Sequence, residues 1–227
     1  MAHVEFYELG IPEVLLQSVL GIVGDNITSL SKQKVSETDP LYEVAKAELI
    51  AEVALYLQWV GRPGMDIYLI AAAEQEENHK ILVGFMIISA HRNGSKVAGL
   101  NYTAVRSENR RQGILRQMMD VLTQHFPLIG LSASIENVPV YEHLGFYPVG
   151  PRGTHVEMKN GDLPKGVMTT VDMDYVSTLP TVQKQKALLR DKYGKKVRDV
   201  YTNFSKLQRA EADRVLDYLN SREIGGI

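Results

Sequence analysis

An apolar run that ends in a basic, glycine-containing turn constrains the fold of this chain more than any other feature. The run covers Val97–Val105, and the turn after it contains Arg110, Arg111 and Gly113. A helical pattern of apolar residues begins around this glycine. A strand-to-helix turn of this kind directs free backbone N–H groups and the positive end of a helix at one point. The sequence therefore predicts a strand, an anion-binding turn and a helix in this order.

Two further apolar runs precede this strand and predict an antiparallel sheet. They cover residues 67–73 and 81–90, with the charged segment 74–80 between them. The turn Arg92-Asn93-Gly94 follows the second run, and Asn-Gly between two apolar runs is a strong hairpin signal. We therefore expect three successive antiparallel strands, joined by a charged turn and by the Asn-Gly turn.

Helical periodicity is present on both sides of these strands. Residues 41–60 are the clearest case, because apolar residues recur at helical spacing with charged residues between them. A shorter helix is expected at 12–23 and another at 112–126, where Pro127 ends it. The remaining predicted elements are a strand at 128–135, a short helix at 139–144, and strands at 146–149 and 154–158. This order is typical of a mixed α/β sheet.

The last part of the chain has a different composition. Residues 181–221 are helical in pattern and rich in charge, and Gly194 is expected to divide them into two helices. An intermittent apolar stripe along these helices must be buried, either against the rest of the chain or against a second copy. The stripe favours a homodimer or a protein partner. The basic stretch 184–198, with Asp191 as its only acid, is expected to be a solvated helix face rather than a nucleic-acid site.

Composition excludes several classes of protein. The 227 residues are 44% hydrophobic, which is sufficient for a large folded core. The net charge of -2 provides no field that would attract nucleic acid or an anionic membrane. The absence of cysteine excludes disulfides and a cysteine acyl-enzyme, and the six histidines lack metal-ligand spacing, so no metal is expected. No signal-peptide pattern or membrane-spanning run is present, so the expected compartment is the cytoplasm.

Two segments resemble the cofactor-handling motifs of the GNAT family of N-acetyltransferases. The family's cofactor loop reads Gln or Arg, two residues, Gly, one residue, then Gly or Ala. The segment Arg110-Arg111-Gln112-Gly113-Ile114-Leu115 is similar to this loop and departs from it at Leu115. The second segment begins at Asn137 and contains Tyr141-Glu142-His143-Leu144-Gly145-Phe146, which is similar to the family signature Tyr-Glu-x-x-Gly-Phe.

The resemblance covers roughly residues 10–160 and implies a fold. It implies an α/β fold in which a mixed, mainly antiparallel sheet is flanked by helices, followed by a helical C-terminal extension. An acyl-CoA-binding domain is then expected at residues 1–165, and the extension at 166–227 is expected to pack on the domain or on a second copy. With its C-terminal extension, the chain also resembles some GNAT-like proteins that bacteriophages encode.

The resemblance further implies acetyl-CoA as the cofactor and a set of residues that bind it. Backbone N–H groups of the loop would hold the pyrophosphate of coenzyme A, and Gly113 would allow the close approach that a Cβ would obstruct. The loop residues in question are Arg110, Arg111, Gln112, Gly113, Ile114 and Leu115. The preceding strand, at Thr103 and Val105, would offer backbone groups to the pantetheine arm. Asn137 stands where family members often have an Asn that contacts the pantetheine.

Tyr141 is the implied general acid, because a phenol with a pKa of about 10 can donate a proton to a thiolate whose conjugate acid has a pKa near 8.5. The alternative is an aromatic residue that covers the core. Family members often carry a general-base Glu on the strand before the loop, but Val97–Val105 contains no acid. Glu136, Glu108 and His91 are the nearby candidates for the base, and exposed carboxylates and a solvated histidine are the alternative interpretations.

These implications lead to one expected function and one rival. The expected function is transfer of an acetyl group from acetyl-CoA to an amine, of a protein or of a small molecule, by direct attack in a ternary complex. The rival is a protein that keeps the fold with weak or no catalysis and binds a partner protein through its C-terminal helices. Leu115, the missing acid and the size of the extension are the three observations that make the rival worth testing.

Overall fold

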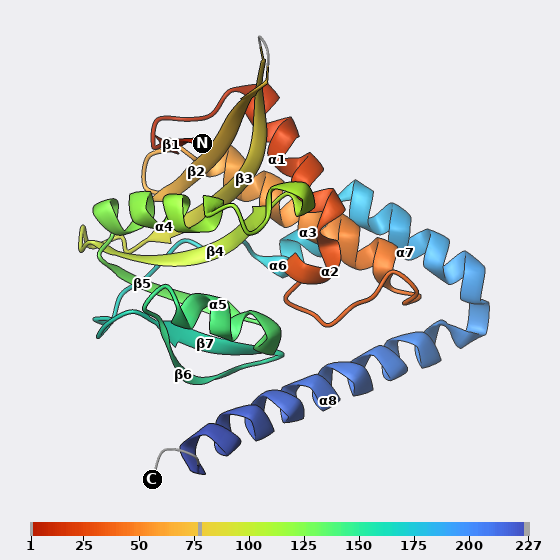
Figure 1. Ribbon diagram of the computed structural model, residues 1–227. Coiled ribbons are helices and arrows are strands. Elements are labelled where there is room, and N and C mark those ends of the chain that lie inside the picture. Colours follow the sequence, from red (N-terminus) through yellow and green to blue (C-terminus); the bar gives the residue numbers. More distant parts are fainter. Residues whose placement is uncertain (1, 77–78, 225–227) are drawn as a thin grey trace. The chain divides into compact units, whose positions relative to one another are not determined.

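The computed structural model describes residues 2–76 and 79–224, and Figure 1 labels its elements. The strands are β1 (His3–Tyr7), β2 (Ile67–Glu76), β3 (His79–Ala90), β4 (Val97–Val105), β5 (Leu128–Ala133), β6 (Tyr147–Arg152) and β7 (His155–Lys159). The α-helices are α1 (Glu13–Asp25), α2 (Ile27–Leu30), α3 (Tyr42–Trp59), α4 (Ile114–His125), α5 (Val138–Glu142), α6 (Met173–Thr178), α7 (Pro180–Tyr193) and α8 (Val197–Ile224). Three short 3-10 helices are η1 (Ser107–Asn109), η2 (Ile135–Asn137) and η3 (Gly194–Lys196).

The strands form one sheet in the order β1-β2-β3-β4-β5-β7-β6. The first four strands pair antiparallel to their neighbours, and β4 pairs with β5 in parallel. The predicted fold class, a mixed and mainly antiparallel sheet with helices and a helical C-terminal part, is confirmed. The Asn-Gly hairpin between β3 and β4 and the break between α7 and α8 at Gly194 are confirmed as well.

The structure corrects the prediction at the edges of the sheet. The strand β1 was not predicted, and it pairs with β2 from His3 opposite Ala73 to Tyr7 opposite Leu69. The predicted charged turn at 74–80 is wrong, because β2 and β3 continue into it and Gln75 pairs with Lys80. Polar residues are tolerated there because the strand ends face water. Residues 77 and 78 of that predicted turn lie outside the described residues.

The chain forms two compact units, each made of three separate stretches. Unit 1 contains Met1–Asn26, Glu52–Leu131 and Lys159–Val171. Unit 2 contains Ile27–Ala51, Ser132–Met158 and Asp172–Ile227. The units therefore alternate along the chain. The expected division into a domain at 1–165 and an extension at 166–227 stays a prediction.

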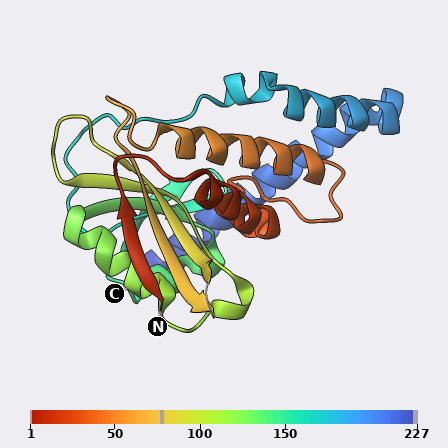
Figure 2. The same ribbon diagram turned by 90° about the horizontal axis from the view of Figure 1, so that it is seen from above.

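In unit 1, helices cover both faces of the antiparallel strands (Figure 2). Gly84 of β3 lies on the face of α4, where an added Cβ would stand 3.2 Å from Met118 Cε and 3.1 Å from Ala104 O. Successive strand residues alternate between faces, so Tyr102 of β4 lies on the opposite face, where its ring contacts that of Tyr56 in an edge-on arrangement. Gly84 thus allows α4 to approach the sheet closely. The helix α4 begins within the segment Arg110 to Leu115, which resembles the cofactor loop of the GNAT family.

In unit 2, the C-terminal helices pack on the N-terminal half of α3. Leu41, Val44 and Leu189 form a buried cluster, and the partly buried Tyr193, Val197, Val200 and Phe204 pack against it. Part of the apolar stripe is therefore covered by this chain itself, and Val215 is fully buried as well, while Tyr201, Leu207 and Leu216 are exposed. Further along, α8 lies against β6. None of the helices in the described part of the chain has the length and apolar composition needed to cross a membrane.

Candidate functional site

In unit 1, the strand β4 leaves its neighbour β5 halfway along its length. The parallel ladder joins Val97–Leu100 to Leu128–Leu131, whereas the ladder with β3 continues to Val105 opposite Gly84. The register with β3 shifts at the same point, since Leu100 pairs with Ile88 and Tyr102 with Ile87. Asn101 is the extra residue of this β-bulge, and a bulge increases the local twist and bends the strand. The end of β4 can therefore offer backbone groups to an extended ligand on the side of β5.

The loop after β4 has a backbone conformation suited to anions. Arg111 and Gly113 have φ angles of 62° and 81°, in the left-handed region. For a residue with a Cβ, such as Arg111, this conformation costs about 1–2 kcal/mol, and strain of this kind gathers at functional sites. The twelve-residue helix α4 follows, and Gln117 N donates its first hydrogen bond to Gly113 O at 3.0 Å. The N–H groups of the first helical turn lack intrahelical acceptors, so they can bind a phosphate.

The side chains of the loop hold its shape. Arg110 donates to Val105 O at 3.2 Å and to Asn26 Oδ1 at 2.6 Å, and Asn26 is buried at the end of α1. Gln112 donates to Glu108 O at 3.1 Å. Both side chains therefore cross-link the loop, and the predicted role of these two residues in cofactor binding stays a prediction. Backbone N–H groups, together with the exposed Arg111, are the better candidates for contact with phosphate.

The first two residues of α4, Ile114 and Leu115, differ in how deeply their side chains are buried. Ile114 is 2% exposed and points into the core, which fixes the start of the helix. Leu115, the departure from the family motif, is half-buried. Part of its side chain therefore packs against the protein rather than extending into solvent above the loop.

The side chain of Thr103, one of the predicted cofactor-binding residues of β4, is partly buried. Its hydroxyl oxygen is buried and has no hydrogen-bond partner among the residues that the structure describes. A buried polar group without a partner costs roughly 1–3 kcal/mol, so such groups are rare and call for an explanation. An open strand, a left-handed loop and a helix N-terminus together fit a ligand that has an extended arm and a pyrophosphate, as coenzyme A has.

Tyr141 lies in unit 2, on the five-residue helix α5. Its ring meets that of the buried Phe146 edge-on, with 6.0 Å between the centroids, and its carbonyl accepts a hydrogen bond from Phe146 N. Burial raises the pKa of Tyr141 to about 12. The hydroxyl therefore keeps its proton throughout the physiological range, which is the form that a general acid requires.

The other two predicted residues of unit 2 have different surroundings. Glu136 forms an ion pair with Arg214 at 2.9 Å, and its own backbone N–H, Arg214 and Lys34 hold its pKa down at about 2. A carboxylate with so low a pKa accepts a proton poorly, which weighs against Glu136 as the general base. Asn137 is exposed at the N-cap of α5. Of the remaining base candidates, Glu108 has a lowered pKa as well, and His91 is buried beside Ser95.

Comparison with known proteins identifies the family. The model of the acetyltransferase (GNAT) family matches residues 33–146, which is half of the chain. The chain belongs to this family. A search of curated proteins gives no match to the chain.

Solved structures share the GNAT fold at low sequence identity. A protein described as histone acetyltransferase HPA2 and related acetyltransferase, from Corynebacterium glutamicum, has 16% identity and a TM-score of 0.50, covering 73% of this chain and 99% of its own. An acyl-CoA N-acyltransferase from Pseudomonas aeruginosa has 15% identity and a TM-score of 0.49, covering 71% of this chain and 100% of its own. The diaminobutyrate acetyltransferase of Paenibacillus lautus has 15% identity and a TM-score of 0.46, covering 70% and 94%. At these identities the likeness concerns the fold alone.

The sequence alone did not indicate the residues that hold the loop at Arg110, the residue Lys34 and the predicted base Glu136 in place. Asn26, which binds Arg110, is 84 positions away from it along the chain. Gln208 and Arg214 of α8 contact Lys34 and Glu136, and nothing in their local pattern distinguishes them from other polar residues of a charged helix. Asn101 carried a weak signal, because an Asn is unusual inside an otherwise apolar strand.

Proposed function

We propose that this protein is an N-acetyltransferase that moves the acetyl group of acetyl-CoA to an amine, of a protein or of a small molecule, by direct transfer in a ternary complex. One observation carries the proposal. The strand β4 leaves β5 at Asn101 and leads into a loop with two left-handed residues at the N-terminus of α4. This combination supplies an open strand edge and an anion site within one unit.

Each part of the site has a role in this proposal. Backbone N–H groups from Arg110 to Leu115 bind the pyrophosphate, and the ends of β4 at Thr103 and Val105 bind the pantetheine. Acetyl-CoA supplies the thioester, whose carbonyl carbon is attacked by the amine nitrogen. A C–N bond forms as the C–S bond breaks, and Tyr141 gives its proton to the departing thiolate. The proton lost by the amine passes to solvent, from which Tyr141 is protonated again.

The missing acid on β4 favours an acceptor that loses its proton easily. A lysine side chain has a pKa near 10.4 and is almost fully charged at neutral pH, whereas an α-amine has a pKa near 8. At pH 8 about half of the α-amine is neutral and able to attack without a general base. We therefore expect α-amines to be better acceptors than lysine side chains for this protein.

Calorimetric titration of coenzyme A and acetyl-CoA tests the proposal. Dissociation constants near 1 μM, about 8 kcal/mol of binding free energy, are expected for the wild type. Gly113→Ala should weaken this binding at least tenfold, because the added Cβ stands at the phosphate site. The protein itself does not obstruct this Cβ, since the nearest atom to a Cβ added at Gly113 is Gln117 Nε2, at 4.0 Å.

Gly94→Ala is the matched control for this substitution. Gly94 is an exposed glycine of the same unit with a φ angle of 71°, and no atom lies within 4 Å of its added Cβ. Both variants pay the same conformational cost of about 1 kcal/mol, but only Gly113→Ala should lose the ligand. Absence of any binding to the wild type at millimolar coenzyme A would end the proposal.

A further inference from the structure

The segment that carries Tyr141 is too short to fix its own position. It consists of η2 and the five-residue helix α5, and isolated helices of this length are not stable in water. Within the segment, Val138 is fully buried and anchors its centre. The two ends carry the acidic residues Glu136 and Glu142. The orientation of Tyr141 therefore depends on what these ends bind within unit 2.

The long helix α8 binds both ends of this segment. Arg214 Nη2 lies 2.9 Å from Glu136 Oε1 at the start of the segment, and Arg222 Nη2 contacts Glu142 Oε1 at its end. The two arginines are about two helical turns apart, roughly 12 Å along α8, which is a distance that the short segment can span. Both guanidinium groups are also held from α8 itself, Arg214 by Glu211 at 3.1 Å and Arg222 by the hydroxyl of Tyr218.

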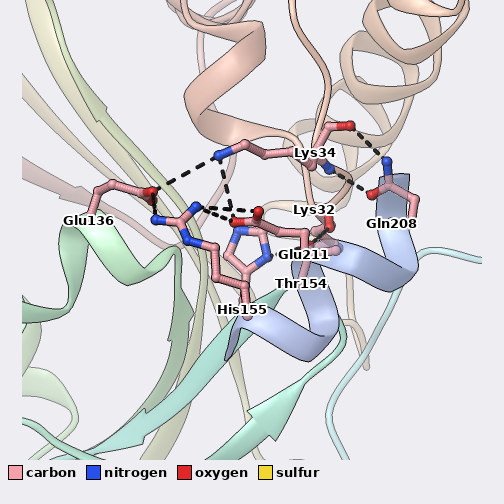
Figure 3. Close-up of polar contacts among 8 residues, drawn as sticks. Lys32, Lys34, Glu136, Thr154, His155, Gln208 and Glu211 are labelled. Carbon is pink, nitrogen blue, oxygen red and sulfur yellow. Dashed lines mark hydrogen bonds and ion pairs between the residues drawn. The ribbon is translucent and has the colours of Figure 1, made fainter. Parts of the chain in front are cut away.

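A second set of contacts fixes α8 along its axis (Figure 3). The amide of Gln208 accepts a hydrogen bond from Lys34 N and donates one to Lys34 O, both at 2.7 Å. One turn later, the buried carboxylate of Glu211 lies 3.6 Å from Lys34 Nζ. Thr154 donates to Lys32 O at 2.7 Å from the turn between β6 and β7. Because α8 cannot slide without breaking the contacts of Gln208 and Glu211 with Lys34, its arginines present fixed donors to Glu136 and Glu142.

We propose that Arg214 and Arg222 are positioning residues for Tyr141. They hold the segment of η2 and α5 at both ends, so that the Tyr141 hydroxyl occupies one position. This inference rests on the proposed function, because it takes Tyr141 as the general acid. Without the arginines the segment samples other positions and the acid step slows, while the loop at Arg110 to Leu115 in unit 1 keeps its affinity for acetyl-CoA.

Hydrogen exchange tests whether α8 holds the segment of η2 and α5, and it requires no amine substrate. The amides of Leu144 and Phe146 donate to the Tyr141 carbonyl at 3.0 and 3.1 Å. In the full-length Arg222→Gln variant, exchange of these amides should be two- to fivefold faster than in the wild type, as expected for the loss of one exposed ion pair. Arg209→Gln, which removes an exposed arginine of the same helix, is the control and should leave both amides unchanged. Equal exchange in Arg222→Gln and the wild type would overturn the proposal.

Steady-state kinetics then test whether the contacts of α8 with the segment affect the reaction rate. The chain has no cysteine, so a thiol reagent reports only the coenzyme A that is released from acetyl-CoA. With glycinamide and spermidine as amines, Arg222→Gln should lower kcat two- to fivefold and leave the KM for acetyl-CoA unchanged. In a Tyr141→Phe background the same substitution should have no further effect, and the charge exchange Glu142→Arg with Arg222→Glu should restore part of the rate.

The outcomes separate this inference from the proposed function. An equal effect of Arg222→Gln in the presence and absence of the Tyr141 hydroxyl would mean that the arginine acts on stability alone, and would overturn the positioning role. If the wild type binds no coenzyme A and releases none, the proposed function fails. Hydrogen exchange would still decide in that case whether α8 holds α5.

Discussion

Replacing Gln208 with methionine tests how firmly the segment before α3 is held within unit 2. The amide of Gln208 exchanges two hydrogen bonds with the backbone of Lys34, each of 2.7 Å. Methionine is similar in length and volume but can make neither of them. Gln208→Met therefore removes the polar contacts and keeps the apolar stem of the side chain.

The expected loss follows from the number and exposure of these hydrogen bonds. A net contribution of about 0.5–1.5 kcal/mol each gives roughly 1–3 kcal/mol for the pair. The lower half of this range applies, because both partners are accessible and water replaces the lost contacts. A loss of about 1.4 kcal/mol corresponds to a tenfold larger population of the released segment. The ion pair between Lys34 Nζ and Glu211, at 3.6 Å, is unaffected by the substitution and limits the change.

Limited proteolysis measures this population directly. Trypsin cleaves after Lys34, and cleavage of a briefly opened segment follows its open population when reclosing is fast. Under native conditions, the peptide that begins at Val35 should appear about tenfold faster from Gln208→Met than from the wild type. Gln183→Met is the control, because the Gln183 amide donates a local hydrogen bond to Ser177 O within unit 2 and should not affect Lys34. Equal cleavage of Gln208→Met and the wild type would refute the reasoning.

Three further predictions concern the acid, the ion-pair network and the core. Tyr141→Phe should lower the rate of coenzyme A release by about 10²–10⁴-fold without changing acetyl-CoA affinity, and a full rate would remove Tyr141 from the mechanism. Since its pKa is raised to about 12, the rate should not fall through loss of this proton at any pH below about 10. Glu136 has its pKa lowered from 4.5 to about 2, so its contribution to stability is complete above pH 4.5 and lost as the pH falls towards 2. Urea unfolding between these pH values should therefore be flatter with pH for Glu136→Gln than for the wild type, and identical slopes would contradict this. Phe146→Ala should cost about 3–5 kcal/mol in urea unfolding, because the ring is 3% exposed and supports Tyr141, and a loss below about 1 kcal/mol would show that the site collapses around the cavity.

Local patterns in the sequence were sufficient to locate most of the elements. The apolar runs of β3 and β4, the Asn93-Gly94 turn and the periodicity of α3 each reflect a preference that acts within a few residues. The strand β1 was missed because its five residues gain their structure from pairing with β2. The charged ends of β2 and β3 were taken for a turn, since composition alone cannot distinguish a solvated strand end from a loop.

The candidate site was less accessible to sequence reasoning, because its geometry depends on contacts between distant residues. The motif at Arg110 to Leu115 located the loop, but it gave no sign that the Arg110 side chain binds Asn26. Glu136 was considered as a base on its position in the chain, and only the structure pairs it with Arg214. The unpaired hydroxyl of Thr103 is likewise a property of packing around β4 rather than of the strand's own pattern.

The alternation of the two units along the chain has a consequence for biosynthesis. Neither unit can be completed by the N-terminal half of the polypeptide, because unit 1 requires Lys159–Val171 and unit 2 requires the stretch that begins at Asp172. Lys34 leaves the ribosome long before Gln208, which stands 174 positions later and holds its backbone. The exposed segments must therefore wait through most of translation, at about 5–20 residues per second, before their partners exist. Both units of this protein are therefore expected to complete their folding only late in synthesis or after it.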